Sequence, residues 1–167
     1  MRHSAVLIAL FQGEQGAEVV LTRRAQHLRH HRGEVSFPGG RLDPGETPVQ
    51  AALREAEEEV CLDPSSVELV GELDHLSTVV SRSHIVPVVG RLPARPALRA
   101  GTTEVDRILF VPLADLLRPD TYREEQWGGG EMARAIHFFF LDDETVWGAT
   151  GRMLVQLLTI AAGVSAG

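Results

Sequence analysis

The stretch from residue 37 to residue 62, FPGGRLDPGETPVQAALREAEEEVCL, constrains the fold of this chain more than any other. Its first half is rich in glycine and proline, which favours a loop. Its second half begins like a helix, because Thr47 is a good N-cap, Pro48 suits the first helical position and Gln50 completes a capping box. The apolar residues that recur at helical spacing after this cap are Val49, Ala52, Leu53, Ala56 and Val60. The stretch therefore predicts a glycine-rich loop that leads into a helix with one buried face.

Three glutamates stand together on one side of this predicted helix. Glu55, Glu58 and Glu59 are spaced i, i+3 and i+4, away from the apolar stripe. Like charges at this spacing repel by about 0.2–0.5 kcal/mol per pair, and the dipole at the helix C-terminus also disfavours them. A bound cation would reverse both penalties, and hard oxygen ligands favour Mg²⁺ or Mn²⁺ over zinc. The alternative is a solvated acidic face on which Arg54 pairs with Glu58.

The residues before the helix favour the metal site over the solvated face. Gly39, Gly40 and Gly45 let the backbone approach a ligand closely and permit a positive φ angle. Glu46 and Arg54 can form an ion pair across the loop. We therefore expect the three glutamates to bind a divalent metal, with a carbonyl group of Gly39 or Gly40 as a further ligand.

The spacing of six of these residues resembles the signature box of the Nudix hydrolases. The six are Gly40, Glu46, Arg54, Glu55, Glu58 and Glu59. That family uses divalent metal to cleave a nucleoside diphosphate linked to another moiety, so the resemblance implies the same reaction here. The box normally carries glycine where this chain has Cys61, and often a larger aliphatic residue at Ala56. Cys61 stands where a glycine usually ends the helix, so this departure concerns the helix C-terminus. Neither departure replaces one of the carboxylates.

A basic segment, RRAQHLRHHR from Arg23 to Arg32, interrupts a chain that is acidic overall. It holds four arginines and three histidines, whereas the whole chain has 16 basic and 23 acidic residues and a net charge of −7. Arginine side chains suit phosphate oxygens, so the segment indicates an anion site. The alternatives are a solvated loop or a contact with the protein's own acidic surface.

The wider pattern favours the anion site. Its positions are Leu21, Thr22, Arg24, Leu28, Arg29, Gly33 and the run FPGG at 37–40. This pattern resembles the motif found upstream of the box in coenzyme A diphosphatases, which split coenzyme A into 3′,5′-ADP and 4′-phosphopantetheine. The resemblance implies that Arg24 and Arg29 recognise the coenzyme, and we expect Gly39 and Gly40 to lie beside the substrate.

The expected mechanism follows from charge. A diphosphate repels an incoming hydroxide, so metal held by the box glutamates must neutralise phosphate oxygens and acidify a water. Either Glu58 or Glu104 is expected to accept the proton, and Glu131 is a weaker candidate for the extra carboxylate. We expect Glu46 and Arg54 to orient the metal-binding glutamates without binding the metal themselves.

Runs of β-branched and apolar residues predict strands along the rest of the chain. These runs are Ala5–Phe11, Ala17–Thr22, Val67–Val70, Leu73–Val80, His84–Gly90, Arg107–Val111 and Ala135–Leu141. Pro87 suggests that its strand is an edge strand or carries a bulge. Tyr122–Met132 contains three glycines in a row and is expected to be a flexible loop that could cover the site. A last helix is expected over Val146–Ala162.

Strands interleaved with two helices predict an α/β fold. The resemblance implies an α/β/α sandwich with a mixed β-sheet, and the length of 167 residues favours a single domain over residues 1–167. Ala5–Phe11 lies behind Arg2 as the apolar run of a signal peptide would, but we expect a buried strand because no cleavage pattern follows. The isolated histidines His75 and His84 have no evident partner and are expected to be structural.

Composition limits the partners. The net charge of −7 gives no support for a general nucleic-acid binder. No apolar run is long enough to span a membrane, and the single cysteine, Cys61, excludes an internal disulfide. We expect a cytoplasmic protein with a small-molecule substrate, as a monomer or homodimer. Two alternatives to a coenzyme A diphosphatase remain. One is a related enzyme for an ADP-sugar, a dinucleotide or an oxidised nucleotide, and the other is a catalytically silent Nudix module that only binds its ligand.

Overall fold

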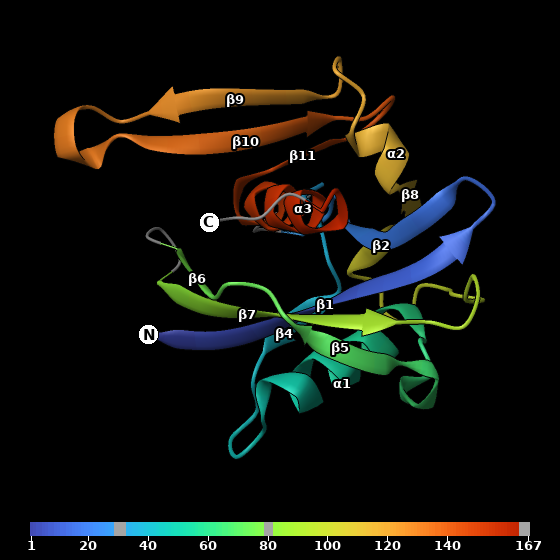
Figure 1. The fold of residues 1–167 in the computed structure, drawn as a ribbon. Coiled ribbons are helices and arrows are strands. Elements are labelled where there is room, and N and C mark those ends of the chain that lie inside the picture. The colour runs from blue at the N-terminus through green and yellow to red at the C-terminus, as the bar shows by residue number, and fades with distance from the viewer. Residues whose placement is uncertain (29–32, 79–81, 164–167) are drawn as a thin grey trace.

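The computed structural model describes residues 1–28, 33–78 and 82–163, and Figure 1 shows their arrangement. The main sheet contains β1 (Arg2–Gly13), β2 (Gly16–Arg24), β3 (Val35–Ser36), β4 (Gly39–Arg41), β5 (Glu68–Glu72), β6 (Leu76–Thr78), β7 (Ser83–Arg91) and β8 (Val105–Pro112). A second sheet contains β9 (Tyr122–Trp127), β10 (Arg134–Phe140) and β11 (Thr145–Trp147). The helices are α1 (Pro48–Val60), α2 (Leu113–Leu116) and α3 (Gly148–Ala161), with 3₁₀ turns η1 (Pro64–Ser66) and η2 (Gly130–Met132).

Strand β1 organises the main sheet. It pairs in parallel with β7 and antiparallel with both β2 and β4, so the sheet is mixed as expected. The predicted hairpin between the first two strands is present, with Gly13 opposite Gly16. Beyond the hairpin end the two strands diverge, and β4 pairs with the first part of β1. This divergence places β4 beside the helix that follows it.

The main sheet has a hydrophobic core on each face. Ala5, Leu7 and Ala9 of β1 face α1, whereas Ile8 faces the layer that contains α3. This alternation is what a strand buried on both faces requires. Figure 1 shows α1 and α3 on opposite sides of the sheet. The predicted α/β/α sandwich with a mixed sheet is therefore confirmed.

The prediction of an edge strand at Pro87 is wrong. Strand β7 lies inside the sheet, between β1 and the pair β5 and β6. The carbonyl group of Pro87 accepts a hydrogen bond of 3.0 Å from the backbone N–H of Leu73, in the connection between β5 and β6. The nitrogen of Pro87 points to the same side of the strand, where the partner strand is interrupted. A proline is tolerated there because its missing donor falls at the interruption.

The C-terminal region also differs from the expectation. Tyr122–Met132 is not a free loop, because its first half is strand β9, which pairs along β10. Strand β10 is not the last strand, because β11 follows it in the sequence before α3 and pairs with it. Val146 of β11 is buried. The glycines fall at the tip of the β9–β10 hairpin, where Gly128 and Gly130 adopt positive φ angles. This hairpin lies across α3 from α1 in Figure 1, so it does not cover the predicted site.

No helix in the described ranges is both long and apolar enough to cross a membrane.

Candidate active site

Helix α1 begins as its sequence predicts. The hydroxyl group of Thr47 accepts the N–H of Gln50 at 3.2 Å, and the side chain of Gln50 accepts the N–H of Thr47 at 2.9 Å. The helix ends at Cys61, which adopts the left-handed conformation with φ 59° and ψ 36°. This conformation costs a non-glycine residue about 1–2 kcal/mol. Cys61 therefore makes the stop that glycine usually makes, and the departure from the box pattern leaves the helix end in place.

A segment distant in sequence holds the same helix end. The N–H of Gly101 donates to the carbonyl group of Glu59 at 2.8 Å, and the N–H of Arg99 donates to that of Val60 at 3.2 Å. A Cβ atom on Gly101 would lie 2.1 Å from the carbonyl oxygen of Glu58, so only glycine fits there. Sequence reasoning misses Gly101, because a single glycine in a loop gives no sign that it faces a helix so much earlier in the chain.

The expected glycine loop is partly a strand. Gly39 and Gly40 belong to β4 and pair with β1, and neither has a positive φ angle, whereas Gly45 does at 79°. A Cβ atom on Gly39 would lie 2.4 Å from the carbonyl oxygen of Ala5, and one on Gly40 would lie 2.7 Å from the carboxyl carbon of Glu55. The glycines thus allow β4 to fit between β1 and the acidic side of α1.

Arg54 connects the loop to the helix. Its Nε and Nη2 atoms donate to the two carboxylate oxygens of Glu46 at 2.8 and 2.9 Å. Its Nη1 atom donates to Glu55 at 2.9 Å and lies 3.3 Å from the Glu58 carboxylate. The hydrogen bonds and charge of Arg54 lower the pKa of Glu46 to about 2. Both the expected pair across the loop and the i, i+4 contact with Glu58 are present.

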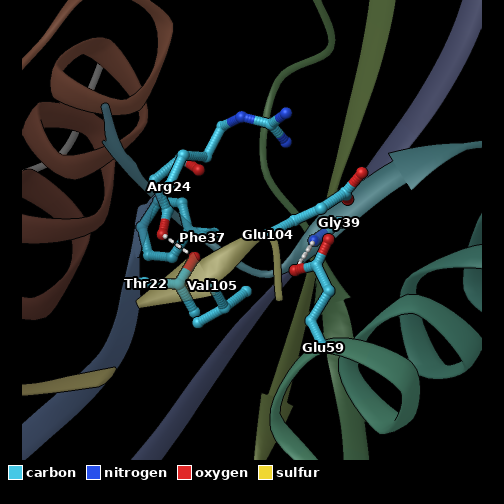
Figure 2. Close-up of a pocket in the computed structure, with 8 residues that line it drawn as sticks. Thr22, Arg24, Phe37, Gly39, Glu59, Glu104 and Val105 are labelled. Carbon is cyan, nitrogen blue, oxygen red and sulfur yellow. Dashed lines mark hydrogen bonds between the residues drawn. The ribbon is translucent and has the colours of Figure 1, made fainter. Parts of the chain in front are cut away.

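Glu59 is the box glutamate that bonds directly to β4. One of its oxygens accepts the backbone N–H of Gly39 at 3.3 Å (Figure 2). Burial, and then the nearby charge of Glu55, raise the pKa of Glu59 to about 8. A cation between these carboxylates would remove that penalty, and its binding would displace a proton.

A cavity of about 40 Å³ adjoins the Glu59 carboxylate. Its lining residues are Thr22, Arg24, Ser36, Phe37, Gly39, Glu59, Glu104 and Val105. Figure 2 shows Arg24, Gly39, Glu59 and Glu104 among the residues that line this cavity. The Nε atom of Arg24 is buried, and no residue in the described ranges accepts a hydrogen bond from it. The structure thus brings together four of the predicted site residues from separate parts of the chain: Arg24, Gly39, Glu59 and Glu104.

The other predicted residues lie further out or elsewhere. The Glu58 side chain is 53% exposed beside Arg54 and does not line the cavity. Glu131 lies in η2 at the far hairpin, and Arg29 falls outside the described residues. His75 and His84, for which the sequence shows no evident partner, contact each other, with His75 Nδ1 at 3.2 Å from His84 Nε2.

The donor set suits a hard divalent cation. The three carboxylates come from one helix turn, beside the backbone of β4, and carboxylate oxygens are ligands that Mg²⁺ and Mn²⁺ prefer. Burial, and then the charge of Glu55, raise the pKa of Glu59, and a bound cation would offset both effects. Among the described residues, no three acidic, histidine or cysteine side chains are already arranged as a complete metal cage. Glu58 would have to turn from Arg54 to join the other two.

Comparison with known proteins identifies the family. The NUDIX domain family matches residues 1–129 of the chain. An uncharacterized Nudix hydrolase NudL of Escherichia coli is 38% identical over 158 residues, which cover 93% of this chain and 81% of that protein. Nudix hydrolase 22, chloroplastic, of Arabidopsis thaliana is also 38% identical, over 172 residues that cover 95% of this chain but only 55% of its own.

Solved structures share the fold at low sequence identity. A Nudix hydrolase from M. smegmatis, RenU, aligns with a TM-score of 0.70 at 17% identity, covering 99% of this chain and 89% of its own. A C. elegans Ap4A hydrolase in a binary complex aligns with a TM-score of 0.57 at 19% identity, covering 66% of this chain and 80% of its own. Because the family match spans most of the chain, the protein belongs to the Nudix hydrolases, enzymes that act on phosphoric anhydrides.

Proposed function

We propose that this Nudix hydrolase is a coenzyme A diphosphatase, which releases 3′,5′-ADP and 4′-phosphopantetheine. The observation that carries the proposal is the unsatisfied Nε atom of Arg24 beside Glu59 and Glu104. A buried donor without an acceptor is costly, and a phosphate oxygen of a bound substrate would satisfy it. Arg24 is also the described member of the arginine pair that the coenzyme A motif contains, which supports this substrate over others.

Glu55, Glu58 and Glu59 would hold the divalent metal that Nudix hydrolases generally use. A carbonyl group of Gly39 or Gly40 would add a further ligand. When bound, Mg²⁺ or Mn²⁺ would neutralise phosphate oxygens and lower the pKa of the attacking water. The hydrogen bonds from Arg54 to Glu46 and Glu55 would keep the carboxylates oriented before metal binds.

Glu104 is the better candidate for the general base. It lines the cavity beside Glu59, whereas Glu58 is exposed and paired with Arg54. The backbone of Glu104 is held in place, because its carbonyl group accepts a hydrogen bond of 2.8 Å from the N–H of Ala25. Glu104 would take the proton of the attacking water while Arg24 holds the phosphate.

A second candidate keeps the reaction and changes the leaving group. The C. elegans structure noted above is an Ap4A hydrolase, which favours a dinucleotide as the alternative substrate. The two candidates share the metal site and differ in what lies beyond the diphosphate. A substrate panel separates them.

The test is chromatography of the products after incubation with coenzyme A and Mg²⁺ or Mn²⁺, with a chelator as control. We expect metal-dependent 3′,5′-ADP and 4′-phosphopantetheine. Arg24→Gln should raise the KM for coenzyme A by about 10- to 100-fold, which corresponds to the usual free energy of a hydrogen bond to a charged group. Arg118→Gln is the control, because this exposed arginine does not line the cavity. Turnover of a dinucleotide but not of coenzyme A would contradict the proposal.

A further inference from the structure

A second cavity lies on the α3 side of the main sheet. Its volume is about 220 Å³, and it shares no lining residue with the cavity at Glu59. Its lining residues are Asp74, Leu76, His137, Arg152, Val155 and Gln156. They come from the β5–β6 region, from β10 and from α3. Two apolar side chains and four polar ones therefore meet where three separate parts of the chain converge.

Tyr122 fixes the role of one of these polar groups, His137. The Tyr122 hydroxyl group lies 2.6 Å from His137 Nδ1, and the two rings stack. A phenol is a stronger acid than a neutral imidazole, so the hydroxyl group donates and Nδ1 accepts. Burial, and then the charge of Glu124, raise the pKa of Tyr122, which keeps this proton in place. The other nitrogen of His137, Nε2, then carries a hydrogen as a donor.

Gln156 is oriented in a comparable way. Its side-chain oxygen accepts the backbone N–H of Asp74 at 3.0 Å, so its amide NH₂ group is left as a donor. Helix α3 is also pressed against β10 at this point, because a Cβ atom on Gly151 would lie 2.5 Å from the carbonyl oxygen of His137. The two donors are thus held by rigid elements.

Arg152 adds a positive charge on the same helix. Within the ranges that the structure describes, its guanidinium group has neither an ion-pair nor a hydrogen-bond partner, although Asp74 lines the same cavity. Arg91, which is also exposed, by contrast pairs with Glu68 at 2.8 Å. An uncommitted guanidinium, an imidazole N–H and an amide NH₂ around one hollow match an oxyanion.

We propose that this second cavity binds a compact organic anion through a carboxylate or phosphate group. Arg152, His137 and Gln156 donate to the oxyanion, and Leu76 and Val155 contact the carbon skeleton. Asp74 accepts from a hydroxyl or ammonium group on the same ligand. The site is separate from the candidate active site, so a ligand there would act on the hydrolase without competing for the Glu59 cavity.

The experiment is an NMR titration of the metal-free full chain with inorganic phosphate, and separately with acetate, at constant ionic strength set by chloride. We expect saturable shifts of the His137 ring nitrogens and the Gln156 side-chain amide. Arg152→Gln should weaken the binding that these signals report by about 10- to 100-fold. The comparison of phosphate with acetate shows which oxyanion the site prefers.

Two further variants make the result decisive. Arg24→Gln removes a donor from the other cavity and should leave the His137 and Gln156 shifts unchanged, whether or not the protein hydrolyses coenzyme A. Tyr122→Phe should weaken phosphate binding although Arg152 is unchanged. The variant lacks the hydroxyl group that donates to His137 Nδ1, so Nε2 is no longer held as the protonated nitrogen. The proposal is overturned if neither anion shifts these signals, or if they respond equally in the Arg152→Gln protein.

Discussion

The two faces of the main sheet are built on different principles. The α1 face carries charge close to the core, with Glu59 largely withdrawn from solvent and Arg54 bonded to Glu46 and Glu55. The α3 face is covered by the larger of the two apolar clusters and by the second sheet, where the buried Glu144 pairs with Arg23 and Arg107. The proposed chemistry lies on the α1 face, whereas the larger of the two apolar clusters lies on the α3 face. Substitutions on the two faces should therefore affect different measurements.

The largest effect is expected at Glu59. Glu59→Gln removes the charge that is proposed to bind metal without removing volume, so kcat should fall by roughly 10³-fold or more while the fold is kept. Glu57→Gln is the matched control, because Glu57 is an exposed residue of the same helix. The measurement is kcat as a function of metal concentration, with circular dichroism to check folding. Near-normal turnover of the Glu59 variant would show that the α1 face does not hold the chemistry.

The next effect belongs to the α3 face. Leu154 is fully buried in α3, so Leu154→Ala should lower the free energy of unfolding by about 2–5 kcal/mol. Because Leu154 lies across the sheet from the box, kcat of the folded protein should stay within about twofold of normal. Urea unfolding and initial rates measure the two quantities. Ile160→Ala, at an exposed position of the same helix, should change neither. A large loss of kcat in the Leu154 variant would remove the distinction between the faces.

The faces also differ in how far the sequence predicts them. The start of helix α1 is predictable to its N-cap, because a capping box and i, i+4 spacing act within a few residues, whereas its end at Cys61 departs from the glycine that the pattern expects. Strand β11 escapes prediction because three residues have no periodicity of their own and are defined only by pairing with β10. Pro87 is misleading because the interruption that accommodates it lies in another strand.

The candidate site shows the same limit. Its carboxylates can be identified from one helix, and Arg24 and Glu104 are candidates individually. That these two lie over the same hollow as Glu59 depends on the pairing of β2 with β8, strands that are far apart in the sequence. Long-range pairing of this kind leaves no local pattern in a single sequence.

A smaller effect tests the distant part of the α1 face, at Gly101. The Cβ atom in Gly101→Ala would meet the backbone oxygen of Glu58, which cannot move without shifting the end of α1. A displacement of the ligands approaching about 1 Å should lower kcat by about 10- to 100-fold and raise the metal concentration needed for activity. Gly71→Ala is the control, because no atom lies within 4 Å of its added Cβ position and its φ angle is ordinary. Equal metal titrations for both variants would mean that the segment only closes a loop.

The smallest effect concerns acid stability, at Glu46. Arg54 lowers the pKa of Glu46 from 4.5 to about 2, so the folded state favours the ionised form. The stabilisation is therefore complete above the unfolded pKa of 4.5 and is lost as the pH falls toward 2. We expect Glu46→Gln to be less stable than the natural protein at about pH 6, with a difference that shrinks between pH 4.5 and pH 2. Denaturant unfolding at several pH values measures it, with Glu14→Gln in the exposed first hairpin as control. A difference that stays constant across this range would mean that the substitution loses packing alone, and that the charge of Glu46 does not contribute to folding.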